Sequence, residues 1–97
     1  MILALLLAAS NSDPTVLIIG VGNQSCATAW SPTQQQSSRD WIGGFWSATN
    51  VERGLIVGRY TDVNGIIGEV RLLCQQNPSM PLSNATVRTY DKLKAQR

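Results

Sequence analysis

The sequence predicts an all-α protein, a small bundle of three to four helices with one disulfide. Along most of the chain, apolar residues recur every three or four positions, which is the spacing of a helix with one buried face. The chain has only two cysteines, Cys26 and Cys74, and they stand far apart. A lone pair of this kind in a small exported domain is typical of one disulfide that closes a long loop.

The composition describes one folded domain and excludes several classes of function. With 97 residues, 43% of them hydrophobic and three of them tryptophans, the chain has enough apolar surface for one core. A net charge of +2, carried by scattered basic residues, is too small to predict a nucleic-acid partner. Histidine, the commonest general base and metal ligand, is absent. Two cysteines offer too few ligands for a metal site. The chain also offers no convergent catalytic set, so the sequence predicts no enzyme activity, metal or cofactor.

Residues 1–19 are predicted to be an export signal or an apolar N-terminal arm, and residues 20–97 a single helical domain. The chain begins with an apolar run, MILALLLAA, which small residues follow as in a signal peptide. This run is too short to cross a bilayer as a helix, so we expect no stable membrane span in the mature protein. A second apolar run, residues 16–19, belongs either to a longer signal cleaved near Gly20 or to an arm packed on the core. Export to the periplasm agrees with the paired cysteines.

The first long helix is expected over about residues 32–49. Ser31 can cap this helix, and Pro32 suits its first position because that position needs no backbone N–H donor. Gln34 completes the pattern of a capping box, in which two side chains satisfy the free backbone groups of the first turn. Asn50 and Gly54 are expected to bracket the exit turn.

The second half of this helix carries an apolar stripe that is rich in aromatic residues. Its members follow each other at helical spacing: Trp41, Ile42, Phe45 and Trp46. We favour core filling for this stripe, and the alternative is a surface that binds a partner protein. Gly43 and Gly44 interrupt it at a cost of about 1 kcal/mol each relative to alanine, so we expect another segment to approach them closely. Trp30 lies outside the periodic segments and is expected to be partly exposed.

Two more helices are expected in the second half of the chain. Residues 55–60 are apolar but contain a glycine, and we interpret them as a packed connecting segment. Asp62 is expected to cap a helix over residues 63–76, which Asn77 and Pro78 end because a residue before proline avoids helical geometry. This helix also has an apolar face, which either fills the core or binds a partner protein. Its members are Val63, Ile66, Ile67, Val70, Leu73 and Cys74. A third helix with a weaker apolar stripe is expected to begin near Pro81.

The segment GVGNQSC at residues 20–26 resembles exported bacterial proteins. Cys26 and two further segments carry a second resemblance: DWIGGFWSATN at residues 40–50 and LCQQNP at residues 73–78, with Leu82 and Ala85 behind them. Together they resemble the small periplasmic helical proteins of the HdeA and HdeB type. Similar patterns, with a tryptophan-x-x-glycine helix and a cysteine near asparagine-proline, occur in Rap1a/Tai-type immunity proteins. The resemblance implies a compact helical fold, a periplasmic location and a bridge between the two cysteines.

The resemblance also implies two functions. For an HdeA-like protein it implies an acid-stress chaperone, whose homodimer dissociates in acid and exposes apolar surface to unfolded protein clients. As the pH falls through about 4, carboxylates lose their charge and basic residues keep theirs, so self-repulsion would loosen the bundle. The alternative is an immunity-type protein that binds one cognate protein, a secreted toxin enzyme, and blocks it. Both functions describe a binding protein that is not an enzyme.

Overall fold

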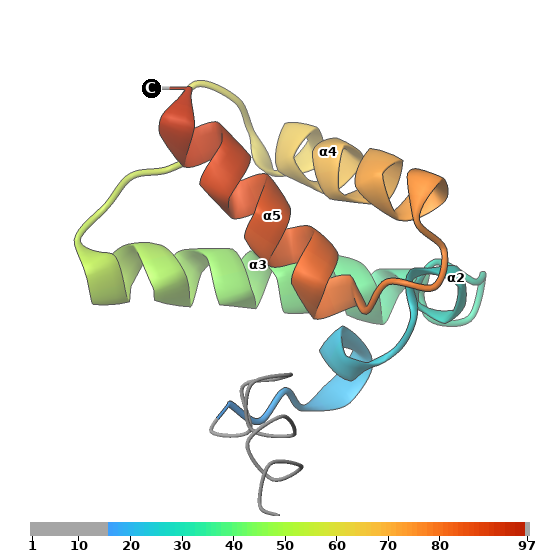
Figure 1. Ribbon diagram of the computed structural model, residues 1–97. Coiled ribbons are helices and arrows are strands. Elements are labelled where there is room, and N and C mark those ends of the chain that lie inside the picture. The colour runs from blue at the N-terminus through green and yellow to red at the C-terminus, as the bar shows by residue number, and fades with distance from the viewer. Residues whose placement is uncertain (1–15, 97) are drawn as a thin grey trace, which may run out of the picture.

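Helices make up the regular structure of residues 16–96, which are the residues that the computed structural model describes (Figure 1). A short 3₁₀ helix comes first, and four α-helices follow it: η1 (Gly20–Asn23), α2 (Cys26–Ala29), α3 (Gln35–Arg53), α4 (Val63–Gln76) and α5 (Leu82–Ala95). No strand forms within these described residues. The predicted all-α bundle is therefore confirmed.

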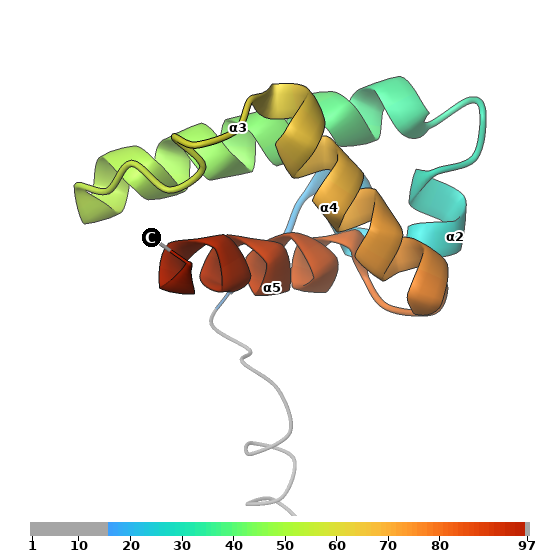
Figure 2. The same cartoon turned by 90° about the horizontal axis from the view of Figure 1, so that it is seen from above.

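The helices cross one another around one core. In Figure 1, α5 crosses the long helix α3, and Figure 2 shows α4 descending from the middle of α3 towards the start of α5, beside α2. Each helix turns an apolar face to this core because burial of such faces is the main favourable term in folding. The buried apolar residues come from every helix: Val21, Cys26, Ala29, Ile42, Trp46, Ile67, Val70, Cys74, Leu82, Ala85 and Tyr90.

The predicted disulfide is confirmed between Cys26 in α2 and Cys74 in the last turn of α4. Their Cα atoms are 5.1 Å apart although 48 positions separate them in the sequence. The two side chains are only 1% and 2% exposed, so the bridge lies inside the core. Backbone hydrogen bonds tighten the same region, since the Cys26 amide donates to the Met80 carbonyl at 2.7 Å. The bridge thus joins α2 to the last turn of α4.

The start of α3 differs from the expected capping box. The helix begins at Gln35, and residues 31–34 form turns before it. The Ser31 hydroxyl donates to the Thr28 carbonyl at 2.8 Å, so it closes the preceding helix α2 and caps nothing in α3. The Ser31 carbonyl instead accepts the backbone amide of Gln35 at 3.0 Å. Ser31 therefore contacts both helices, the hydroxyl serving α2 and the carbonyl serving α3, and the short helix α2 was not expected.

Neighbouring residues define the start of α4 and the end of α3. The Asp62 carboxylate accepts the Gly65 amide at 2.8 Å and caps α4, which spans the expected Val63–Gln76. Gly54 ends α3 with a positive φ of 66°, a conformation that glycine adopts without steric cost. Residues 54–62, called the connector below, lead from α3 to α4 through a series of turns.

The expected close approach at the two helical glycines was wrong. A Cβ atom built on Gly43 or on Gly44 meets no heavy atom within 4 Å, so no described segment packs against either residue. The cost of glycine in this helix is therefore not offset by tight packing within residues 16–96. Close packing occurs instead at Gly22, where an added Cβ would collide with the indole ring of Trp41.

Alanine in place of Gly44 is expected to stabilise the protein by about 0.5–1 kcal/mol, because Gly44 is exposed inside a helix and alanine restricts the unfolded chain. The urea concentration at the unfolding midpoint, followed by circular dichroism, measures this gain. Gly65→Ala is the matched control: its added methyl group would meet the Thr61 side chain, so no gain is expected. A lower midpoint for Gly44→Ala would contradict the prediction.

The predicted export signal falls mainly outside the described residues. Only residues 16–19 of the predicted N-terminal segment are described, and they form neither helix nor strand. The Ile19 carbonyl accepts a hydrogen bond from the Trp41 indole at 3.1 Å, whereas the Leu17 side chain is 82% exposed. Across residues 16–96, none of the helices combines the length and the hydropathy that a bilayer crossing requires.

Candidate functional site

The predicted apolar stripe of α3 lies in and beside the core. Ile42 and Trp46 are buried, while Trp41 and Phe45 are half-buried and stack on each other with ring centroids 5.5 Å apart. On α4, Ile67 and Val70 are buried, and Ile66 and Leu73 are half-buried. Val63, the first residue of α4, is 55% exposed because the helix begins beyond the edge of the core.

Tyr90 of α5 forms the centre of the aromatic cluster. Its ring lies 5.0 Å from that of Trp46 and meets Phe45 edge to face at 6.5 Å. The guanidinium of Arg53 lies 5.4 Å from the same ring centroid, on the outer side of the cluster. Tyr90 is only 1% exposed, so its hydroxyl needs a partner inside the protein.

Asn50 supplies that partner and also holds the connector. Its Oδ1 atom accepts the Tyr90 hydroxyl at 2.7 Å and the Val57 amide at 3.2 Å. Its Nδ2 atom donates to the Val57 carbonyl at 3.2 Å, and the Trp46 indole donates to the same carbonyl at 2.9 Å. The side chain of Asn50 therefore ties together α3, the connector and α5.

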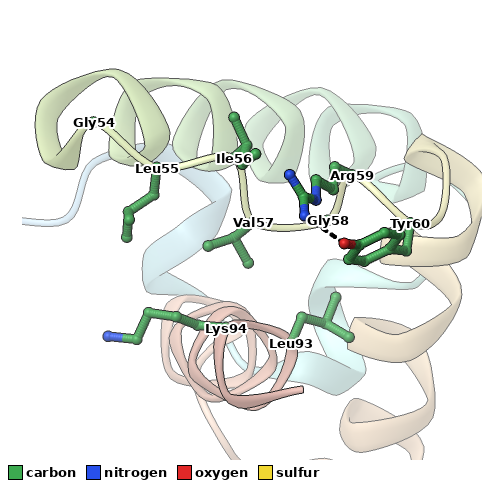
Figure 3. Close-up of a pocket in the computed structure, with 9 residues that line it drawn as sticks. All are labelled: Gly54, Leu55, Ile56, Val57, Gly58, Arg59, Tyr60, Leu93 and Lys94. Atoms are coloured by element: carbon green, nitrogen blue, oxygen red, sulfur yellow. Dashed lines mark hydrogen bonds between the residues drawn. The ribbon is translucent and has the colours of Figure 1, made fainter. Parts of the chain in front are cut away.

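A pocket of about 300 Å³ lies between this fixed connector and the C-terminal end of α5 (Figure 3). Its lining comes from residues 54–60 together with Leu93 and Lys94. In Figure 3, Leu55 and Val57 point from the connector towards α5, and Leu93 lies across from them. The lining is thus apolar in its middle, and it contains no carboxylate.

The rim of the pocket is cationic and partly aromatic. The Arg59 guanidinium donates to the Tyr60 hydroxyl and lies 4.6 Å from the centroid of the Tyr60 ring. Lys94 extends along the other end of the pocket in Figure 3. Ile56 and Tyr60 expose 62% and 76% of their surface beside the pocket. The residues that line the pocket, which include Ile56 and Tyr60, are called the connector surface below.

A second, smaller hollow of about 220 Å³ lies over the disulfide. Trp30 lines it and is half-buried, with the Arg71 guanidinium 5.1 Å from the centroid of the Trp30 ring. The Trp30 indole nitrogen is buried and makes no hydrogen bond with the described residues. The exposed side chains of Arg71 and Gln75 also line this hollow.

Sequence reasoning missed Asn50 and the pocket. The sequence placed Asn50 at the start of an exit turn, but α3 continues for three further residues to Arg53. An asparagine inside a helix is unfavourable because its side chain competes for backbone groups, and that anomaly was the available signal. Nothing in the sequence marked Tyr90 and Val57 as the hydrogen-bond partners of Asn50, because neither residue is unusual in its own segment.

The described residues also show what chemistry the surface can perform. Nowhere in residues 16–96 do three or more histidine, cysteine, aspartate or glutamate side chains gather as they would around a metal ion. The connector surface instead combines apolar lining, an aromatic ring and two cations, which suits non-covalent binding. A comparison with known proteins finds no matching family model, curated protein or solved structure. The function is therefore inferred from the residues themselves.

Proposed function

We propose that this protein is a binding module of an oxidising compartment, the periplasm, and that it docks one cognate protein at neutral pH. The supporting observation is the connector surface, where a formed pocket opens beside exposed Ile56 and Tyr60. Asn50 holds the connector in place by two hydrogen bonds to Val57, and a third bond joins Asn50 to Tyr90 of α5. A surface that is already ordered loses less conformational entropy on binding, so it favours affinity.

The composition of the connector surface favours a protein partner. Tyrosine and arginine are enriched where proteins contact each other, because both offer a large contact area with a polar end. Here Arg59 and Tyr60 hold each other in one arrangement at the edge of the pocket. Exposed Ile56 adds apolar contact next to them. A partner segment could therefore bury an anchor in the pocket and rest on the rim.

The buried disulfide supports the proposed compartment. Disulfides persist in oxidising environments such as the periplasm and are rare in the cytosol. The Cys26–Cys74 bridge is nearly inaccessible to solvent, so a structural role fits it better than a redox role. A periplasmic module that docks one protein is what the resemblance to Rap1a/Tai-type immunity proteins implies, with a secreted toxin enzyme as the protein that it blocks.

An acid-stress chaperone of the HdeA or HdeB type is the second candidate. Its support is the Lys92–Glu69 ion pair, which joins α5 to α4 at 2.9 Å and is exposed on both sides. With eight basic and six acidic residues, neutralising every carboxylate raises the net charge from 8 − 6 = +2 to +8. Acid would thus remove a contact between helices and add self-repulsion, while the disulfide limits the opening. Unfolded clients would then meet the exposed apolar core.

Site-specific crosslinking tests the first candidate. A photoreactive amino acid replaces Ile56 in the intact, oxidised protein, made in its own host. The matched control carries the same amino acid at Leu72, an exposed apolar residue on α4 that lies outside the pocket. We expect one protein adduct of discrete mass from position 56 and none from position 72. The partner identified by mass spectrometry, once purified, should bind the Ile56→Ser variant at least several-fold more weakly than the wild type.

Two results would overturn this proposal. The first is equal crosslinking from both positions, since a docking surface must be local. The second is an absence of adducts from position 56. Suppression of the aggregation of acid-unfolded alcohol dehydrogenase at pH 3, without any adduct at pH 7, would support the chaperone instead.

A further inference from the structure

We infer, on the premise that the connector surface docks a protein, that its pocket takes an apolar side chain from an acidic segment of that partner. The inference names the chemistry of the ligand: one apolar anchor with at least one carboxylate close to it in the sequence. It depends on the size of the pocket, on the sign of the charges around it, and on the hydrogen-bonding state of Arg59.

The size of the pocket suits a side chain. Its volume of about 300 Å³ is at the lower end of the range for sites that hold small molecules. One or two side chains of leucine size fill such a space. The apolar groups that would contact them come from Leu55, Val57 and Leu93.

The charged residues that line the pocket are both cations. Arg59 and Lys94 are the only charged residues in the lining. The C-terminal ends of α3 and α5 carry partial negative charges of about half a unit each. Each of those ends has basic residues of its own in the last turn, Arg53 in α3 and Lys92 with Lys94 in α5. Among the described residues Arg59 makes no ion pair with a carboxylate, so its positive charge can attract an anion.

Arg59 still has donors for a carboxylate. A guanidinium has five N–H donors, and Arg59 uses one of them on the Tyr60 hydroxyl. The Tyr60 ring below the guanidinium restricts its orientation, which lowers the entropy cost of a second contact. A carboxylate that meets Arg59 would form charge-assisted hydrogen bonds, which are stronger than neutral ones. A basic segment would meet repulsion at the same place.

Two blocked hexapeptides test the inference, Glu-Asp-Leu-Leu-Glu-Asp and Lys-Lys-Leu-Leu-Lys-Lys, each acetylated and amidated. They are titrated at pH 7 into the intact, oxidised, ¹⁵N-labelled protein, and amide shifts are recorded. We expect the acidic peptide to shift amides of residues 54–60 and of Leu93 and Lys94. The basic peptide should bind at least tenfold more weakly, because it lacks the charge-assisted contact. Added salt should weaken binding of the acidic peptide, since salt screens the attraction between exposed charges.

Variants assign the effect to Arg59. Arg59→Gln should weaken binding of the acidic peptide about tenfold. Arg88→Gln is the matched control: Arg88 is an exposed cation on α5 outside the pocket, and its loss should change the affinity less than twofold. Lys94→Gln is a second pocket variant, for use if Arg59→Gln loses the amide spectrum of the folded protein.

The outcomes separate this inference from the proposed function. Equal affinity for the two peptides would overturn the preference for an acidic segment. Absence of shifts in the connector with either peptide would overturn the inference, and a crosslinked partner from position 56 would then still support the proposed function. Decanoate is titrated as a third probe. If it shifts the pocket amides and the acidic peptide does not, the pocket binds a small amphiphile and the inference is overturned.

Discussion

Removing the disulfide by the double substitution Cys26→Ala and Cys74→Ala is expected to lower the free energy of unfolding by about 4 kcal/mol. The bridge closes a loop of 48 residues and restricts the unfolded chain, and the chain-entropy relation gives about that value. A single domain is commonly stable by about 5–15 kcal/mol, so most of the margin would be lost. We expect the melting temperature, measured by circular dichroism, to fall by about 20 °C. The denaturant m-value should rise, because the unfolded chain without a crosslink exposes more surface.

Wild-type protein reduced under denaturing conditions and refolded with reductant provides the control for this prediction. It has both thiols and no bridge, so it separates the lost crosslink from the loss of two buried sulfur atoms. The reduced wild type and the double variant should unfold at similar denaturant concentrations. If the oxidised and reduced wild types had the same midpoint, the stabilising role of the bridge would be contradicted.

Replacing Asn50 by alanine is expected to cost about 3 kcal/mol, the second largest effect. The change removes hydrogen bonds to the Val57 amide, the Val57 carbonyl and the Tyr90 hydroxyl, at 3.2, 3.2 and 2.7 Å. Each is worth about 1 kcal/mol, and the partners left unpaired add to the cost. Denaturant unfolding measures the loss of stability. Hydrogen exchange at the Val57 amide should accelerate more than exchange elsewhere, since the connector opens first.

Asn64→Ala is the matched control for Asn50→Ala. Asn64 is exposed on α4, and its side chain accepts one hydrogen bond, from Arg39 at 2.8 Å. Its loss should change the free energy of unfolding by no more than about 0.5 kcal/mol. Tyr90→Phe removes only one of the three Asn50 contacts and should cost about 1 kcal/mol. Equal costs for the two asparagine variants would contradict the structural role of Asn50.

Asn50 also links stability to the proposed site. The pocket exists because the connector stays in one conformation above the end of α5. A protein that keeps its helices but loses this order should therefore bind its partner more weakly. The amide spectrum of Asn50→Ala distinguishes the two effects, because shifts confined to residues 54–60 indicate a local change and loss of dispersion indicates unfolding.

Helix α4 and the disulfide could be predicted from the sequence because their signals are local or unambiguous. Asp62 caps the first turn, and Asn77 and Pro78 stop the last one, so both bounds of α4 depend on neighbouring residues. With two cysteines there is only one possible pairing. Ser31 was interpreted wrongly although the local capping pattern was present. Its hydroxyl donates instead to the Thr28 carbonyl at the end of α2, a helix that was not expected.

The sequence by itself determined the helical class, the bounds of α4 and the single cysteine pair, because helix period, capping and pairing depend on neighbours or on unique residues. Only the tertiary structure decided where the connector lies and what it forms. Asn50 and Tyr90 are 40 positions apart, and the pocket needs a turn after α3 to meet the end of α5. Such contacts depend on how the helices cross, and side-chain spacing within one helix does not specify the position of another.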